Sequence, residues 1–291
     1  MSGGHVVVAD GPALVFGGPY SNLQATRAVL AEARRRGVPA RRTLCTGDVV
    51  AYGADAAATL DLVAGSGVVC VAGNCEESLA AGSDDCGCGF GAGTACDLLS
   101  RAWYAHAARQ VASAHRAWMA ALPARATVAL EDGRRLAVIH GGARETSRFL
   151  FASEPDATLA AEVAEAGADG VIAGHCGLPF ARVLGGDGGA LWLNAGAVGM
   201  PANDGTARGW FALLTPGARG LRVEMLPLDY DHTGAASAMR AARLPEGYAA
   251  ALETGLWPSL DVLPPAERAA AGVPLRPAPL DWPAPLRANA A

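Results

Sequence analysis

Short apolar runs alternate with stretches of helical periodicity along most of the chain. The apolar runs that predict strands occupy residues 13–18, 41–48, 67–74, 170–177, 190–199 and 209–228. Apolar residues at helical spacing predict helices near residues 22–36, 55–64 and 157–166. Because strands that alternate with helices are typical of parallel sheets, the pattern predicts an α/β fold.

A segment of different composition interrupts this alternation at residues 80–125. It opens with the glycine- and cysteine-rich stretch AGSDDCGCGFGAG and continues with Leu98, Leu99, Trp103, Ala107 and Val111 at helical spacing. We expect a helical insertion here, followed by a β-hairpin that turns at Asp132-Gly133.

The whole chain divides into three parts, and the inserted segment lies within the first of them. We expect a main domain over residues 1–230, a helical extension over 231–257 and a proline-rich tail over 258–291. Proline-rich segments are typically extended or disordered, and we expect the same of this tail.

Composition removes several classes of function. The 291 residues are 51% hydrophobic, enough for a sizeable core, and they include no lysine, which excludes a P-loop lysine or a lysine Schiff base. A net charge of −5 without a basic run argues against nucleic acid as a bulk ligand. No apolar stretch is long enough for a membrane span and the start does not resemble a signal peptide. Seven cysteines, an odd number, argue against a disulfide framework, so we expect a cytoplasmic protein with reduced thiols.

Four polar residues follow predicted strands, where side chains converge at the carboxyl edge of a sheet. They are Asp48, Asn74, His140 and His175, each with a neighbouring glycine. Taken singly, each is a common turn or structural residue. A carboxylate, an amide and two imidazoles in succession instead predict a site for Mn²⁺, Fe²⁺ or Zn²⁺.

The order of these blocks, GD, GNCE, HGG and GHCG, resembles the calcineurin-like metallophosphoesterase family in its small bacterial phosphodiesterase and phosphatase branch. The later stretch NAGAVGMPANDG resembles a loop of the same branch, and the resemblance covers roughly residues 13–230. It implies a four-layer α/β/β/α sandwich of two mixed sheets. It also implies two metals bridged by an aspartate and hydrolysis of a small-molecule phosphoester. A homo-oligomer is compatible with this interpretation.

Three residues depart from the family pattern in a consistent way. Gly18 stands where the family has an aspartate, Tyr20 where it has a histidine, and Gly177 where it has the second of two paired histidines. In the family all three bind the same metal, whereas the ligands of the other metal are all present. The resemblance therefore predicts one retained metal site, with about one divalent ion per chain.

A further departure concerns the chemistry itself. Cys75 stands where the family has a histidine beside the leaving group, and Glu76 follows it; we expect both to line the substrate side. A thiol has an ordinary pKa about two units above that of histidine, which weakens ordinary phosphatase chemistry. Further candidates for a second metal or for the substrate are Tyr20, Cys86, Cys88, Cys176 and Arg144.

These observations favour a metal-dependent phosphoesterase-like hydrolase. Two alternatives stay open. One is a non-phosphatase metalloprotein that uses the metal together with its cysteines for redox or ligand chemistry. The other is a catalytically inactive binding module of the same fold.

Overall fold

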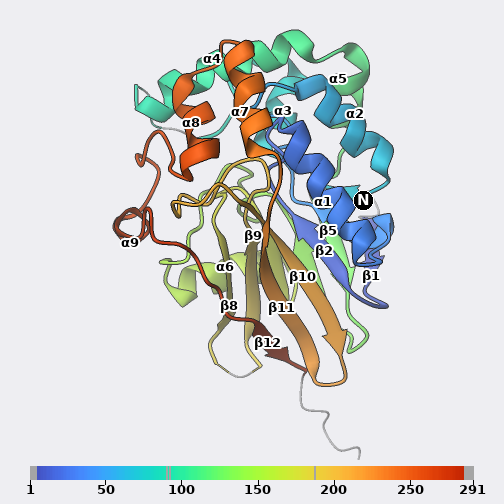
Figure 1. Ribbon diagram of the computed structural model, residues 1–291. Coiled ribbons are helices and arrows are strands. Elements are labelled where there is room, and N and C mark those ends of the chain that lie inside the picture. Colours follow the sequence, from blue (N-terminus) through green and yellow to red (C-terminus); the bar gives the residue numbers. More distant parts are fainter. Residues whose placement is uncertain (1–4, 90, 92, 187, 285–291) are drawn as a thin grey trace, which may run out of the picture.

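Two six-stranded sheets pack face to face in the computed structural model, which describes residues 5–89, 91, 93–186 and 188–284 (Figure 1). The first sheet has the order β1 (His5–Val8), β5 (Ala126–Ala129), β6 (Arg135–Val138), β7 (Gly170–Ala173), β9 (Ala190–Ala195), β8 (Pro179–Leu184). The second has the order β12 (Leu280–Pro283), β11 (Gly220–Leu228), β10 (Gly209–Gly217), β2 (Ala13–Phe16), β3 (Thr43–Cys45), β4 (Val69–Cys70). Both sheets mix parallel and antiparallel pairs.

Helices cover the outer faces of both sheets. The second sheet is covered by α1 (Leu23–Arg35), α2 (Ala56–Ser66), α7 (His232–Ala241) and α8 (Glu246–Thr254). The first sheet is covered by α6 (Asp156–Glu165). A separate apolar core, which includes Leu44, Val128 and Trp210, fills the space between the two sheets. The predicted four-layer α/β/β/α sandwich is therefore confirmed.

The inserted segment forms helices as expected. It contains α4 (Ala95–Gln110) and α5 (Ser113–Ala120), which pack against α2 and against α3 (Asn74–Ala81). The side chain of Trp103 is fully buried, but Leu98 is 57% exposed, so one position of the predicted apolar stripe faces solvent. The helical period is correct, and the width of the buried stripe is smaller than expected.

The predicted hairpin is also confirmed. Strands β5 and β6 pair antiparallel, and the N–H of Leu130 donates to the carbonyl of Arg134 across the turn. The Asp132 carboxylate accepts from the N–H of Arg134, which closes the turn.

The described part of the proline-rich tail, expected to be extended or disordered, includes a helix and an extended strand. It contains α9 (Pro265–Ala269) and β12, and β12 pairs antiparallel with β11 as an edge strand. Trp282 is 1% exposed, and its ring faces the Arg134 guanidinium at 3.6 Å. Burial of Trp282 thus holds against the sheet a segment whose composition alone indicates an extended or disordered chain. Residues 285–291 of the predicted tail lie outside the described residues.

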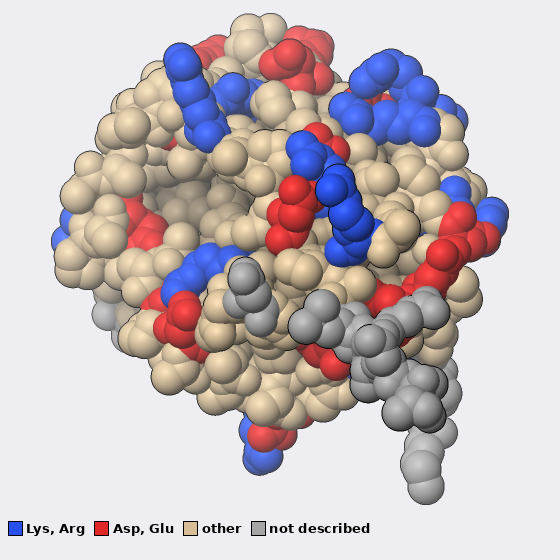
Figure 2. Space-filling view, turned by 90° about the horizontal axis from the view of Figure 1, so that it is seen from below, with Lys and Arg blue, Asp and Glu red and all other residues tan. Residues whose placement is uncertain are grey.

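The surface carries charges of both signs. On the face shown in Figure 2, arginine and acidic side chains lie beside one another and do not form separate fields. Within the described part of the chain, no helix has both the length and the apolar character needed to cross a membrane.

Candidate metal centre and adjoining pocket

The four predicted ligands come from both sheets and meet at one edge of the sandwich. Asp48 follows β3, Asn74 is the first residue of α3 after β4, His140 follows β6 and His175 follows β7. Each side chain sits just past the carboxyl end of a buried strand, where an α/β sheet usually binds its ligand.

The other three polar groups surround the Nε2 atom of His140. It lies 3.1 Å from Asn74 Oδ1, 3.0 Å from His175 Nδ1 and 3.3 Å from Asp48 Oδ2. One ligand atom each from Asp48, His140 and His175 lies within 4.8 Å of the others, and all four residues are buried. The structure therefore brings together the four residues that the sequence singles out.

Hydrogen bonds outside the cluster fix the orientation of two of these groups. His140 Nδ1 lies 2.6 Å from the carbonyl of Thr46, which can only accept, so the proton of a neutral ring is on Nδ1. Asn74 Nδ2 donates to the carbonyl of Cys86 at 2.9 Å, which turns Oδ1 toward His140. Several acceptor lone pairs therefore face one small space, an arrangement that requires a proton or a cation.

The pKa directions agree with this arrangement. Burial would raise the pKa of Asp48, but the charges of His140 and His175 lower it overall. Burial would lower the pKa of His140, yet the carboxylate of Asp48 raises it, whereas burial and repulsion from His140 lower the pKa of His175 to about 3. These directions give His140 the higher proton affinity of the two rings, and its Nε2 lies between the acceptors.

Glu76 is held by hydrogen bonds from the main chain. Its carboxylate accepts from the main-chain N–H groups of Asp48 at 2.7 Å, Gly73 at 2.9 Å and Val50 at 3.2 Å, and the residue is fully buried. Asp48 itself has a φ of +53°, a left-handed conformation that requires support from its surroundings. Burial, followed by the charge of Asp48, raises the pKa of Glu76 to about 7.

Cys75 contacts the cluster mainly through its main chain. Its N–H donates to Asp48 Oδ1 at 3.3 Å, and its Sγ lies 3.5 Å from Asn74 Nδ2. Burial and the charge of Asp48 raise the pKa of the Cys75 thiol well above its ordinary value, so the thiol is neutral.

The remaining cysteines correct one expectation. Cys86 and Cys88 form a disulfide beside Asn74, so the expectation that all thiols are reduced is wrong for this pair. Cys176 is free but buried, its Sγ faces the carbonyl of Leu178, and burial raises the pKa of its thiol to about 12. None of these three sulfurs belongs to the group formed by Asp48, His140 and His175.

Arg144 lies on the surface. Its guanidinium forms an ion pair with Glu165 at 2.7 Å, and 80% of its side chain is exposed. It does not line the pocket described below, so a contact with substrate would require it to leave this partner.

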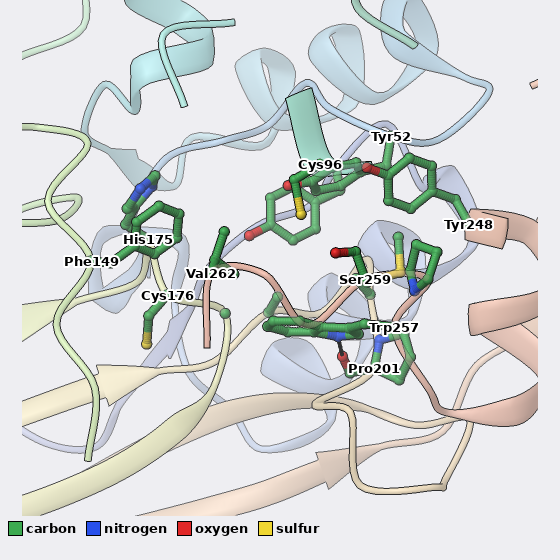
Figure 3. Close-up of a pocket in the computed structure, with 15 residues that line it drawn as sticks. Tyr52, Cys96, Phe149, His175, Cys176, Pro201, Tyr248, Trp257, Ser259 and Val262 are labelled. Carbon is green, nitrogen blue, oxygen red and sulfur yellow. Dashed lines mark hydrogen bonds between the residues drawn. The ribbon is translucent and has the colours of Figure 1, made fainter. Parts of the chain in front are cut away.

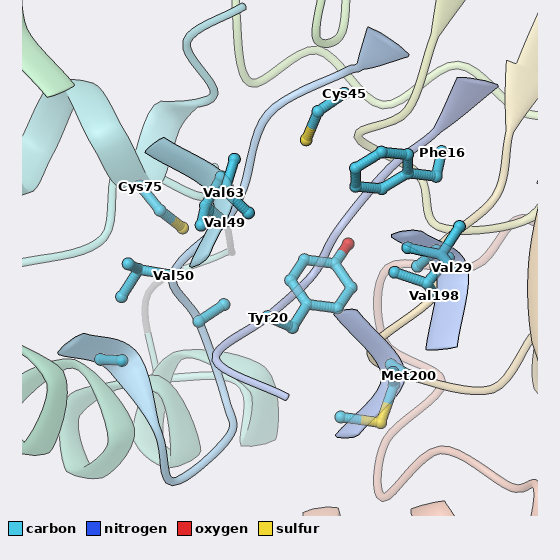
Figure 4. Packing of buried hydrophobic residues seen from close by; sticks show 14 of the residues in the cluster. Phe16, Tyr20, Val29, Cys45, Val49, Val50, Val63, Cys75, Val198 and Met200 are labelled. Atoms are coloured by element: carbon cyan, nitrogen blue, oxygen red, sulfur yellow. The ribbon is translucent and has the colours of Figure 1, made fainter. Parts of the chain in front are cut away.

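The three residues that depart from the family pattern lie close together. A Cβ on Gly18 would overlap the ring of Tyr20, and a Cβ on Gly177 would stand 3.8 Å from the Tyr20 hydroxyl. Figure 4 shows the Tyr20 ring among apolar side chains that include Phe16, Val198 and Met200. Burial, followed by the charge of Asp48, raises the pKa of Tyr20 well above its ordinary value, so its hydroxyl stays protonated.

A pocket adjoins the cluster on this side (Figure 3). His175, Gly177 and Tyr20 form its inner end, and further walls come from Tyr52, Phe149, Tyr248 and Trp257. Its volume is about 580 Å³ including the opening to solvent. Cys176, a further sequence candidate, also lines the pocket, whereas Tyr52, Phe149, Tyr248 and Trp257 were missed because they come from separate segments with no common motif.

Comparisons with known proteins agree with this fold. No protein-family model matches the sequence, and no curated protein matches it. Among solved structures, the metallophosphoesterase from Sphaerobacter thermophilus is 23% identical, covers 84% of this chain and 99% of its own, and has a TM-score of 0.65. The hypothetical protein PH1004 from Pyrococcus horikoshii OT3 is 16% identical, covers 86% of this chain and 99% of its own, and has a TM-score of 0.69. Two mixed sheets in this order, covered by helices and similar to a solved metallophosphoesterase over most of both chains, show that the chain has the calcineurin-like metallophosphoesterase fold.

Proposed function

We propose that the chain is a metal-dependent phosphoesterase that acts on small-molecule phosphoesters and holds one divalent cation. The observation that carries the proposal is the convergence of Asp48 Oδ2, Asn74 Oδ1 and His175 Nδ1 on His140 Nε2. Such a convergence of acceptors is costly in a buried site unless a cation compensates it.

The donor set fits a divalent transition metal. Two imidazole nitrogens, a carboxylate and an amide oxygen suit Mn²⁺, Fe²⁺ or Zn²⁺. A cation held there would polarise a phosphoryl oxygen and lower the pKa of a nearby water molecule. The Thr46 carbonyl supports this by holding His140 with Nε2 directed at the cluster.

A single cation per chain is supported by the residues beside this cluster. Gly18 and Gly177 offer no ligand atom, and the Tyr20 ring fills the space that a side chain at position 18 would need. The neutral phenol is a weak ligand. We therefore propose that the second metal position of the family is absent from this chain.

We propose that Glu76 and Cys75 hold the Asp48 loop. Both oxygens of Glu76 already accept from main-chain N–H groups, and Cys75 donates its own N–H to Asp48. Their contacts support a positioning role for Asp48 more than the direct contact with substrate expected from the sequence.

The test is metal content together with hydrolysis. Protein purified without added metal is analysed for bound metal and assayed on p-nitrophenyl phosphate and its bis-ester. We expect about one metal per chain, with retention and hydrolysis both lost in His140→Ala and His175→Ala. His232→Ala, outside the cluster, is the matched control and should behave as wild type. A metal-free wild type that hydrolyses neither ester would favour the inactive binding module.

The disulfide gives one observation in favour of the redox alternative. Cys88 Sγ lies 3.4 Å from Asn74 Nδ2, so the Cys86–Cys88 disulfide adjoins a proposed metal ligand. Iron in excess of one atom per chain with strong visible colour would support redox chemistry over hydrolysis.

A further inference from the structure

We infer that the pocket beside the metal centre binds the organic group of the substrate, and that this group is an uncharged aromatic ring on a single phosphate. The inference rests on the proposed function, since it assigns the phosphate to the metal centre. It names a substrate class that the fold alone does not specify.

The walls of the pocket have the chemistry of an aromatic-binding site. Five aromatic side chains line it, and none of the other described lining residues is an acid or an arginine. The aromatic residues are Tyr20, Tyr52, Phe149, Tyr248 and Trp257. Apolar pockets with a few polar groups at one end are typical of small-molecule sites, and stacked rings add affinity beyond the buried area.

Trp257 is held in place before any ligand binds. Its indole Nε1 donates to the carbonyl of Pro201 at 2.6 Å, and its main-chain N–H donates to Asn203 Oδ1 at 2.8 Å. The ring lies flat along one side of the pocket in Figure 3. A fixed ring stacks on a ligand without losing side-chain freedom, which favours binding.

The opposite wall is equally constrained. The rings of Tyr20 and Tyr52 meet edge to face at 4.9 Å, and those of Tyr52 and Tyr248 lie 4.8 Å apart. Tyr52 also contacts the buried ring of Trp103 on α4 at 5.1 Å. The inserted helix therefore supports the pocket from behind.

The pocket and the metal centre share a wall. His175 lines the pocket, and the ring of Phe149 lies 4.2 Å from the His175 ring. Gly177 also lines the pocket, and a Cβ there would stand in van der Waals contact with the Trp257 ring at 3.6 Å. A phosphate at the cluster would place its ester group in the pocket beside His175.

The charges around the pocket argue against polyphosphates. Among the described residues that line the pocket there is no arginine. Arg144 and Arg148, which precede Phe149 in the sequence, form ion pairs with Glu165 and Glu162 respectively. Additional phosphates would enter an apolar space without a compensating charge. An aromatic cage can also bind a quaternary ammonium group, and the experiment separates that case.

The experiment compares three alkyl phosphate monoesters on the metal-loaded full chain. Values of kcat/KM are measured for benzyl phosphate, ethyl phosphate and choline phosphate, and calorimetry measures binding of benzylphosphonate and ethylphosphonate. We expect benzyl phosphate to exceed both other esters by about ten- to hundredfold, as expected for a ring buried in an apolar pocket.

Variants assign the preference to the pocket. Trp257→Leu should lower the ratio of benzyl to ethyl phosphate to within about threefold, because the stacking face is lost. Tyr248→Leu tests the opposite wall if the Trp257 variant does not fold. Trp118→Leu, on α5 and partly buried outside the pocket, is the matched control and should keep the wild-type ratio.

The outcomes distinguish this inference from the proposed function. Equal kcat/KM for benzyl and ethyl phosphate would overturn the inference and leave the proposed function standing, and a preference for choline phosphate would overturn the aromatic assignment. Benzylphosphonate binding that depends on Trp257, with no hydrolysis of any ester, would support the pocket and overturn the proposed function. A lack of benzylphosphonate binding to the metal-loaded protein would overturn the inference.

Discussion

The ring of Tyr20 lies over Gly18, in the space that a side chain at position 18 would occupy. The main-chain N–H of Tyr20 donates to the carbonyl of Asp48 at 3.1 Å, and both Gly18 and Tyr20 have positive φ. The turn after β2 is therefore fixed to the Asp48 loop, and an aromatic ring stands where the resemblance noted in the sequence implies metal ligands.

This relationship predicts coupling between the two positions. Gly18→Ala should reduce the free energy of unfolding by about 2–3 kcal/mol in the wild type, because the methyl group overlaps the Tyr20 ring and φ is unfavourable. In a Tyr20→Ala background the same change should cost only about 1 kcal/mol, the backbone strain alone. Urea unfolding of the four proteins measures the coupling, and additive effects would show that the ring does not depend on the glycine.

The sequence predicts the α/β class of the fold from local patterns, whereas the four-layer arrangement is what the family resemblance implies. Strand–helix alternation, the helix spacing of α1, α2 and α6, and the Asp132-Gly133 turn are all confirmed. The convergence of the four polar residues also follows from local information, since each stands at the end of a buried strand. Their role as ligands stays a prediction.

The features that the sequence does not predict depend on tertiary contacts. Trp257 follows α8 and lines the same pocket as Tyr20, although the two residues lie far apart in the sequence. No local spacing of residues therefore reveals the pocket. The strand at 280–283 forms within a proline-rich segment because β12 pairs with β11 and Trp282 is buried in the core between the sheets. The contacts of Glu76 were missed because its partners are main-chain N–H groups, which carry no signal in the sequence.

Glu76 is expected to determine the shape of the Asp48 loop. Glu76→Gln leaves one acceptor oxygen for three main-chain N–H groups and places a donor among them, so the free energy of unfolding should fall by about 2–4 kcal/mol. Metal retention should weaken in parallel, as measured by metal content after dialysis. Glu77→Gln is the matched control, because Glu77 is exposed on the same helix and should behave as wild type. Equal behaviour of the two variants would contradict the role assigned to Glu76.

Cys75 is expected to be dispensable for metal binding. Cys75→Ala keeps the main-chain N–H that donates to Asp48 and removes a neutral buried thiol, so metal content should stay near one per chain. Stability should fall by about 1–2 kcal/mol through the small cavity. Loss of metal from this variant would instead show that the sulfur is a ligand.

The last described strand is expected to be part of the folding unit. Trp282→Ala removes a buried ring, its hydrogen bond to the carbonyl of Gly189 and the contact with Arg134, so unfolding free energy should fall by about 3–5 kcal/mol. Val273→Ala, at a residue 59% exposed in the same segment, is the control and should change stability by less than about 0.5 kcal/mol. Chemical denaturation measures the free energy of unfolding of both variants. An unchanged value for Trp282→Ala would mean that the tail adds nothing to stability.

Asp204 is expected to make stability depend on pH in the acidic range. The residue is 1% exposed and its carboxylate accepts from the N–H groups of Thr206 and Leu275 and from Arg208. Burial would raise the pKa of Asp204, but these hydrogen bonds lower it below the ordinary value of 3.8. Because the folded protein releases the proton more readily than the unfolded chain, the stabilisation is complete above the unfolded pKa and is lost as pH falls through the folded pKa.

Asp204→Asn should therefore be less stable than wild type by about 2–3 kcal/mol at neutral pH, since it loses the ionised acceptor. The difference should stay constant down to about pH 5 and shrink below about pH 4, because the wild-type carboxylate then becomes protonated. Asp229→Asn, at an exposed position, provides the control and should follow wild type at every pH. Urea unfolding from about pH 3 to about pH 7 measures all three proteins. A difference that grows as pH falls would reverse the sign and exclude a stabilising carboxylate at Asp204.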